Sequence, residues 1–233
     1  WLKFVSPMSG ASPPLFSDLR HAWEEAPAVV YRDGESDVLT ILGQPVMESW
    51  ERPYMSAMAE AACSAGGRIL EVGFGLGISA AAIDSFPDVV EHVIFEANEQ
   101  VCGQAGLWSD GAARPTTVYQ GFWQDLVDDF PAGSFDGILF DCFPLTAADY
   151  RDGEVVEFFP VAHRLLRSGG IFAFYFDCGS SWAEAERGFL ADTLPMLEKV
   201  GFSSVRFSDV FVSPRKDCPY FWKDRFLLPV ATK

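Results

Sequence analysis

Basic residues are scarce in this sequence. It carries 17 Lys and Arg against 33 Asp and Glu, for a formal net charge of −16. A surface this acidic repels phosphate backbones, which argues against nucleic acid as a ligand. The same charge suits a small cationic substrate, but it also serves solubility, so composition alone leaves these two interpretations open.

Histidine and cysteine are scarce too, and neither has the spacing of a metal site. The three histidines, His21, His92 and His163, are far apart. The cysteines are odd in number, form no C-x-x-C, and are typical of reduced thiols in a cytoplasmic protein. They are Cys63, Cys102, Cys142, Cys178 and Cys218. We therefore expect neither a structural nor a catalytic metal.

The sequence also lacks long apolar runs, internal repeats and low-complexity segments. Every stretch of about 18 residues contains charge, so we expect no transmembrane helix and no membrane partner. The first residue is Trp rather than Met, and the segment Trp1 to Val5 is too short for a secretory h-region, so we expect no signal peptide. Hydrophobic residues make up 49% of the 233, which is ample for one substantial core.

From residue 68 onward, apolar runs typical of strands alternate with helical patterns. The predicted strands are 69–72, 92–95, 116–119, 135–140, 171–176, 203–207 and 225–230. The predicted helices are 18–26, 46–65 with an interruption near Pro53, 78–85, 99–108, 122–130, 154–167 and 183–200. Residues 1–20 are predicted to be an arm that either closes over a site or is disordered. The alternation predicts an α/β fold, whose ligands bind at the carboxyl ends of the strands.

A glycine-rich segment follows the first predicted strand. Glu71 precedes Gly73, Gly75 and Gly77, and this spacing differs from the dinucleotide pattern G-x-G-x-x-G. Glu96 follows about twenty residues later, at the end of the next strand, where a carboxylate can accept hydrogen bonds from both ribose hydroxyls. Strand, glycine loop and strand-end acid together predict a site for an adenosine-type cofactor. The aromatic residues Trp123 and Phe122 either flank the adenine or belong to the core.

The acidic-x-G-x-G-x-G pattern resembles motif I of class I S-adenosylmethionine-dependent methyltransferases, which implies that cofactor. Asp141 ends the fourth predicted strand in Phe-Asp-Cys-Phe-Pro, where such enzymes face the methyl group to be transferred; a loop-capping role is the alternative. Taken by pattern alone, Glu51 belongs to the solvated face of a helix.

Several longer blocks resemble the guanidinoacetate N-methyltransferase family across nearly all of residues 20–233. They are Gln44 to Met55, Gly67 to Gly75, Phe135 to Leu145, Arg164 to Gly170, Ser181-Trp182, and Asp217 to Tyr220. The resemblance implies a class I methyltransferase (Rossmann-like) fold, α/β with a mostly parallel seven-stranded sheet and helices on both faces, plus an N-terminal helical lid. Residues 1–65 would then be an arm and helices covering the active site, and 66–233 the cofactor-binding core of one structural domain.

By the same resemblance, Glu51 and Asp141 are the two carboxylates that grip a guanidino group and are the predicted catalytic residues. The predicted cofactor-binding residues are Trp23, Tyr54, Met55, Glu71, Gly73, Gly75, Gly77, Glu96, Gly121, Trp123 and Asp141. The predicted substrate-binding residues are Glu51, Asp141, Asp177, Gly179 and Ser180.

Two departures from the family pattern bear on the site. The segment Ile171 to Ser180 is slightly longer and carries Asp177, an acid that could pair with an α-ammonium group. Gln124 stands where the family tends to have an acid before Asp125, which weakens the assignment of the adenine site. Free L-arginine fits the first departure, so L-arginine and guanidinoacetate are both predicted acceptors.

The hypothesis is therefore methyl transfer from S-adenosylmethionine to a terminal guanidino nitrogen of a small molecule, by a monomer or homodimer. The alternatives are a protein-arginine methyltransferase, a non-catalytic Rossmann-like binding module, and a nicotinamide dehydrogenase. The glycine spacing disfavours the dehydrogenase, and the presence of both candidate acids disfavours the inert module.

Overall fold

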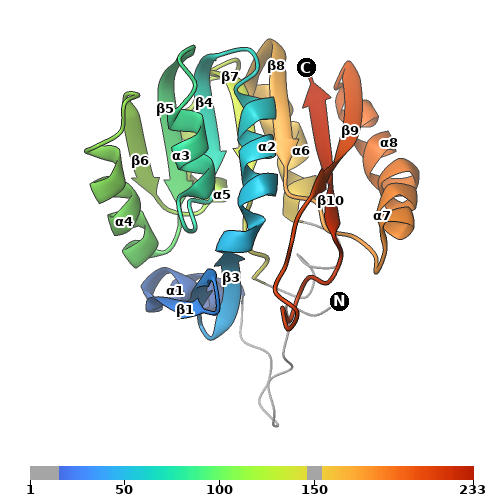
Figure 1. The fold of residues 1–233 in the computed structure, drawn as a ribbon. Coiled ribbons are helices and arrows are strands. Elements are labelled where there is room, and N and C mark those ends of the chain that lie inside the picture. The colour runs from blue at the N-terminus through green and yellow to red at the C-terminus, as the bar shows by residue number, and fades with distance from the viewer. Residues whose placement is uncertain (1–15, 146–153) are drawn as a thin grey trace.

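The computed structural model describes residues 16–145 and 154–233, and its central feature is a seven-stranded sheet in the order β6-β5-β4-β7-β8-β10-β9 (Figure 1). The strands are β4 (Gly67–Val72), β5 (Val89–Glu96), β6 (Thr116–Gln120), β7 (Phe135–Phe140), β8 (Leu166–Phe174), β9 (Ser204–Phe211) and β10 (Arg225–Thr232). Pairing is parallel from β6 through β8, and β10 is antiparallel to both of its neighbours. The predicted mostly parallel α/β sheet is confirmed.

Helices cover both faces of this sheet (Figure 1). One face carries α2 (Arg52–Ala62), α3 (Ile78–Asp84) and α4 (Glu99–Ser109), and the other carries α5 (Trp123–Leu126), α6 (Glu154–Leu165) and α8 (Leu194–Val200). The predicted helix 183–200 is divided into α7 (Trp182–Gly188), a π-helix (Phe189–Thr193) and α8.

Two apolar layers result because successive residues of a strand point to opposite faces. Leu70 and Ile138 pack in the cluster that contains α6, whereas Ile69 and Leu139 pack against α2. These strands are buried on both sides, which explains their near-continuous apolar sequences.

The N-terminal region contains more sheet than the sequence predicted. After α1 (Phe16–Glu25), the chain forms an antiparallel sheet of β1 (Ala28–Asp33), β2 (Ser36–Ile41) and β3 (Gln44–Glu48). The helix predicted to start at residue 46 is therefore wrong in its first part, because 44–48 pairs with β2. A 3₁₀ turn (Ser49–Glu51) follows, and Pro53 stands in the first turn of α2, where its missing N–H costs nothing. The expected helical lid is thus one helix with a small sheet, and most of the predicted arm lies outside the described residues.

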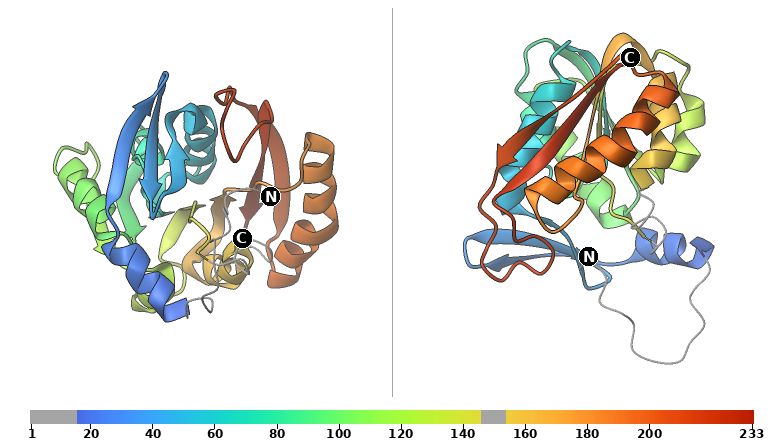
Figure 2. Two further views of the ribbon diagram at one scale, coloured as in Figure 1. Left: turned by 90° about the horizontal axis from the view of Figure 1, so that it is seen from below. Right: turned by 90° about the vertical axis from the view of Figure 1, so that its right-hand side faces the viewer.

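The small sheet is tied to the long connection between β9 and β10, which extends down to it in Figure 2. In that connection, Arg215 donates to the carboxylate of Asp33 at 2.7 Å and to that of Glu48 at 2.8 Å. On the other side, the Asn98 side-chain amide donates to the carbonyl oxygens of Trp23 and Ala26, both at 2.8 Å, which holds the end of α1. Asn98 from the middle of the chain and Arg215 from its C-terminal part therefore hold the N-terminal layer beneath the main sheet.

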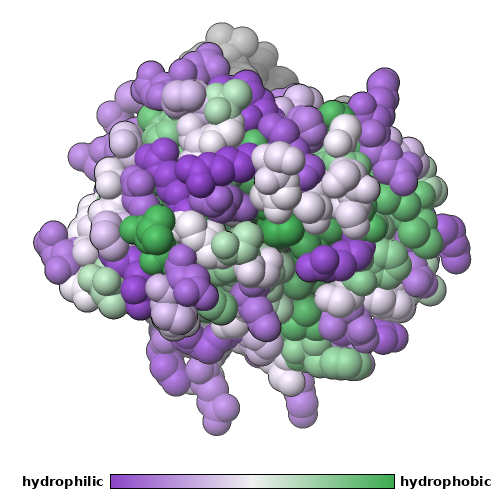
Figure 3. Space-filling model, turned by 90° about the horizontal axis from the view of Figure 1, so that it is seen from above, coloured by the Kyte–Doolittle hydropathy of each residue, from purple (hydrophilic) through white to green (hydrophobic). Residues whose placement is uncertain are grey.

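The strand order reverses at β4, which has β5 on one side and β7 on the other. The carboxyl ends of these strands point toward the N-terminal layer (Figure 1). The opposite face is a mosaic of hydrophilic side chains and smaller apolar patches (Figure 3). Within residues 16–145 and 154–233, none of the helices has the length and apolar character needed to span a bilayer.

Candidate active site

A cavity of about 460 Å³ opens at the carboxyl ends of β4, β5 and β7. Its floor includes strand-end residues, and the small N-terminal sheet contributes Leu39, Ile41, Val46 and Met47 to its wall. Four carboxylates also line it, those of Glu96, Asp141, Asp177 and Asp192. The position agrees with the prediction that ligands bind at the point where the strand order reverses.

The glycine loop forms one wall through its backbone. Gly73 has φ of 94°, and a Cβ atom there would lie 2.1 Å from the carbonyl oxygen of Asp141. At Gly75, with φ of 54°, a Cβ atom would lie 2.9 Å from the sulfur of Met47. Only glycine fits such positions, so the loop offers bare backbone to whatever occupies the cavity. Gly77 is the residue before α3 and stands behind this wall.

Glu96 projects from the end of β5 and is buried. Its two carboxylate oxygens accept hydrogen bonds from the backbone N–H groups of Phe74 at 3.0 Å and Asn98 at 2.8 Å. Burial raises the pKa of Glu96, and these N–H groups oppose that rise by stabilising the charged form. The backbone N–H groups of Gly75 and Ala97 also interact with this carboxylate, which lines the cavity, so a ribose diol would meet acceptor oxygens that are already fixed in place.

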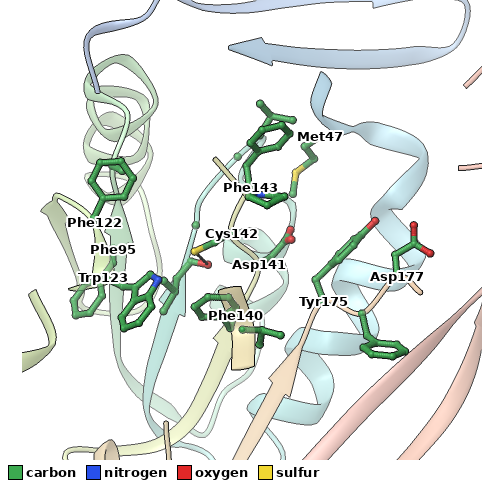
Figure 4. A pocket seen from close by; sticks show the side chains of 18 of the residues that line it. Met47, Phe95, Phe122, Trp123, Phe140, Asp141, Cys142, Phe143, Tyr175 and Asp177 are labelled. Atoms are coloured by element: carbon green, nitrogen blue, oxygen red, sulfur yellow. Dashed lines mark hydrogen bonds between the residues drawn. The ribbon is translucent and has the colours of Figure 1, made fainter. Parts of the chain in front are cut away.

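Aromatic side chains form the neighbouring walls, as the close view shows for Phe122 and Trp123 (Figure 4). Trp23 from α1 stacks on Phe143, with ring centroids 4.9 Å apart and planes inclined by 14°. Trp123 lines the cavity while it packs edge-on against Phe158 in the core, at 5.1 Å. Trp123 is therefore a core residue that also reaches the cavity, and its contact with an adenine ring stays a prediction.

Asp141 lies directly after β7, against the glycine loop. Its backbone N–H donates to the carbonyl oxygen of Val72 at 2.9 Å, which joins the ends of β4 and β7. Figure 4 shows Tyr175 between Asp141 and Asp177. Burial is the main cause that raises the pKa of Tyr175 well above its usual range, and the carboxylates of Glu51, Asp177 and Asp141 add to it. Tyr175 thus lies among the three candidate substrate acids, and no sequence motif indicated it.

Glu51 is buried at the start of α2. One of its oxygens accepts hydrogen bonds from the Tyr220 hydroxyl at 2.7 Å and from the backbone N–H of Glu48 at 2.9 Å. The neighbouring acid Glu48 is fully buried and forms its ion pair with Arg215. These two acids are therefore not equivalent, since an arginine from the β9–β10 connection neutralises Glu48.

The segment after β8 is held by side chains from other elements. The Lys223 ammonium forms an ion pair with Asp177, and Trp222 Nε1 donates to the carbonyl oxygen of Ser180 at 3.3 Å. Both the backbone N–H and the hydroxyl of Ser180 donate to Glu184 at 2.7 Å. These hydrogen bonds lower the pKa of Glu184, and they engage the backbone donor of Ser180 within the protein.

The predicted site residues thus fall into two groups. Those that line the cavity are Trp23, Gly73, Gly75, Glu96, Gly121, Trp123, Asp141 and Asp177. Among the described residues, the cavity walls do not include Glu51, Tyr54, Met55, Glu71, Gly77, Gly179 or Ser180. Direct ligand contact by this second group stays a prediction.

Two members of the second group support the walls from behind. Tyr54 donates to the carbonyl oxygen of Leu227 at 3.0 Å and accepts from the N–H of Phe176 at 3.2 Å. Glu71 accepts from the Ser79 hydroxyl and lies 2.9 Å from His92 Nε2, and the side chains of Glu71 and His92 are fully buried. These contacts position the segment beside Tyr175 and the base of the glycine loop.

The glycine loop, the buried acid Glu96 at the end of β5 and a cavity at the strand reversal are the arrangement of a class I S-adenosylmethionine-dependent methyltransferase. Solved structures of the same fold include the spermidine synthase of Thermotoga maritima, with TM-score 0.65, 16% identity, and coverage of 90% of this chain and 70% of that one. Another is the O-methyltransferase TomG of Streptomyces achromogenes, in complex with S-adenosylmethionine, with TM-score 0.52, 17% identity, and coverage of 77% and 79%.

The family model of guanidinoacetate N-methyltransferase matches residues 15–233, so the chain belongs to that family. Curated relatives include proteins called protein arginine N-methyltransferase 2. That of Yarrowia lipolytica is 30% identical over 65% of this chain and 32% of its own length. That of Cryptococcus neoformans is 31% identical over 65% of this chain and 48% of its own length. The chain thus spans less than half the length of these relatives.

Proposed function

We propose that this methyltransferase methylates a terminal guanidino nitrogen of a small molecule, either free L-arginine or guanidinoacetate. The observation that carries the proposal is the position of Asp141, an acid in the cavity wall whose carbonyl oxygen packs against Gly73 of the cofactor loop. A cation held by Asp141 would lie beside the cofactor. The acidic lining as a whole favours such a positively charged acceptor.

The residues present fit the cofactor. Gly73 and Gly75 bring bare backbone to the cavity wall at positions where a Cβ atom would collide with Asp141 or Met47, and Glu96 presents acceptors suited to a ribose diol. When bound, S-adenosylmethionine supplies an electrophilic methyl group on a sulfonium. Trp23 and Trp123 provide apolar walls that exclude water from that part of the cavity.

The acceptor needs acids because a guanidinium is a poor nucleophile. Its pKa exceeds about 12, and its charge is delocalised over three nitrogens. Asp141 would accept a bidentate pair of N–H bonds and align the planar group. Glu51, held by Tyr220, would localise charge and take the proton lost from the nitrogen as the N–C bond forms. Alignment and a positioned base together supply several kcal/mol.

A radiolabelled methyl-transfer assay with L-arginine and guanidinoacetate as acceptors tests the proposal. We expect label in at least one product, and transfer to neither would overturn it. An arginine-containing peptide serves as a third acceptor, because the curated relatives are named for protein arginine. Transfer to the peptide alone would identify a protein methyltransferase. Binding of S-adenosylhomocysteine without any transfer would instead indicate the non-catalytic module.

A further inference from the structure

A lysine and an aspartate form a charged pair at the edge of the cavity, beyond the acids that face the guanidino group. Asp177 lines the cavity, and the ammonium of Lys223 pairs with its carboxylate. The same ammonium donates to the carbonyl oxygen of Gly179 at 3.2 Å and lies 3.5 Å from that of Cys178. The Lys223 side chain is only 10% exposed and lies over the Phe221 ring at 4.9 Å.

This arrangement differs from an exposed surface salt bridge, which is usually worth little. Lys223 comes from the connection between β9 and β10, and Asp177 follows β8, so two separate segments bring opposite charges together beside the cavity, where Asp177 and Cys178 are lining residues and Lys223 adjoins both. Asp177 retains a second carboxylate oxygen, and the longest contact of Lys223, to Cys178, is the weakest of its three. A ligand ammonium could therefore use that second oxygen of Asp177, and a ligand carboxylate would replace Cys178 as the third acceptor of Lys223.

Within the proposed guanidino methylation, on which this inference rests, we infer that Asp177 and Lys223 bind the head group of an α-amino acid. Asp177 accepts from the α-ammonium, and Lys223 donates to the α-carboxylate. The acceptor is then a guanidino α-amino acid of the L-arginine type. Guanidinoacetate has no ammonium group and is several bonds shorter, so it cannot satisfy both charges.

The hydrogen bonds around the pair favour this role for Lys223. The N–H of Ser180, which could otherwise bind a carboxylate, already donates to Glu184 at 2.7 Å. An ammonium group is thus the donor that this segment presents to an anion. A zwitterion also leaves each charge of the Asp177–Lys223 pair with a counter-ion, whereas a purely cationic or anionic ligand leaves one charge unbalanced.

Four acceptor compounds distinguish the contribution of Asp177 from that of Lys223 in a methyl-transfer assay. L-Arginine carries both, agmatine lacks the carboxylate, 5-guanidinopentanoate lacks the ammonium, and guanidinoacetate is short. We expect Lys223→Met to lower kcat/KM about 10- to 100-fold for L-arginine and 5-guanidinopentanoate while agmatine changes by less than about threefold. Asp177→Asn should show the reverse selectivity, affecting L-arginine and agmatine.

Matched controls are Lys216→Met, which removes an exposed lysine of the same connection, and Asp209→Asn, which breaks an ion pair with Arg225 in the strands β9 and β10. Neither should change selectivity, and calorimetry with S-adenosylhomocysteine checks that all variants fold and bind cofactor. Equal losses for all four acceptors, or guanidinoacetate as the preferred acceptor of the unaltered protein, would overturn the inference and leave the methyltransferase proposal intact. Transfer to no guanidino compound would instead overturn the proposed function.

Discussion

The cofactor side and the acceptor side of the cavity are built in different ways. The predicted cofactor side is centred on one continuous stretch, 67–98, in which the glycine loop and Glu96 reach the cavity. The predicted acceptor side takes Asp141, Tyr175 and Asp177 from separate elements of the cavity wall, with Glu51 behind them, and tertiary contacts position these side chains. The glycine loop is determined by residues that are close together in the sequence. The arrangement of charges predicted to bind the acceptor depends on contacts between segments that are far apart in the sequence.

The acceptor side should lose turnover without losing cofactor. We expect Asp141→Asn and Glu51→Gln each to reduce kcat about 10²- to 10⁴-fold, because each removes a charge that aligns or deprotonates the guanidino group. Affinity for S-adenosylhomocysteine, measured by calorimetry, should stay within a few-fold. Glu60→Gln, on the exposed face of α2, is the control and should leave kcat unchanged. Loss of cofactor binding in both variants would mean that their roles are structural.

The cofactor side should instead be sensitive to added volume. Gly73→Ala places a methyl group 2.1 Å from a backbone oxygen at φ of 94°, so we expect destabilisation of about 3 kcal/mol and loss of S-adenosylhomocysteine binding. Thermal unfolding and calorimetry measure the two effects. Gly103→Ala in α4 meets open space and should stabilise slightly. A Gly73→Ala protein that binds cofactor normally would contradict this role of the glycine loop.

Glu96 adds a pH dependence to the cofactor side. If the carboxylate accepts hydrogen bonds from the ribose, as predicted, affinity for S-adenosylhomocysteine should fall as pH is lowered through the raised pKa of Glu96. Glu96→Gln should bind about tenfold more weakly and lose this dependence. Calorimetry from neutral to mildly acidic pH measures it, and Glu99→Gln, an exposed neighbour, should retain it. If the affinity of Glu96→Gln for S-adenosylhomocysteine still falls as pH is lowered, a group other than Glu96 causes the pH dependence.

The raised pKa of Glu96 has the opposite effect on the stability of the protein without ligand: acidic pH weakens cofactor binding but favours the folded state. The pKa of Glu96 is higher in the folded protein than its ordinary value of 4.5 in an unfolded chain, so the folded state holds the proton more tightly. Its contribution to stability is fully present below pH 4.5 and is lost as pH rises through the folded pKa. Glu96→Gln should therefore show a smaller decrease in unfolding free energy over that interval, measured by urea denaturation. An identical pH slope in both proteins would contradict the assignment.

Substitution of Tyr175 should have the smallest effect on activity, and it tests whether the acceptor side can be altered without changing cofactor binding. Because it lies between Asp141 and Asp177, we expect Tyr175→Phe to lower kcat/KM for the guanidino acceptor about fivefold while cofactor affinity stays the same. Tyr31→Phe, on the exposed strand β1, is the matched control. Weakened S-adenosylhomocysteine binding in Tyr175→Phe would show that the two sides are not separable at this residue.

One wrong helix boundary and two residues that the sequence analysis missed have physical causes. Apolar residues at Val46, Met47 and Trp50 fit a helical spacing, but 44–48 gains more by pairing with β2, and the helix begins only at Arg52. Lys223 had no signal at all, because its pairing with Asp177 depends on where two connections meet. Tyr175 was hidden for the same reason, inside an apolar strand pattern.

By itself, the sequence determined the strand–glycine–helix unit, the acid at the end of β5 and the alternation that produces a mostly parallel sheet. Those features depend on residues close together in the chain, on backbone freedom at glycine and on the alternation of side chains along a strand. Only the tertiary structure decided that Arg215 neutralises Glu48, that Tyr220 binds Glu51, and that a lysine stands beside Asp177. Charge pairing acts over a few ångströms in space, so it is settled by packing between distant segments.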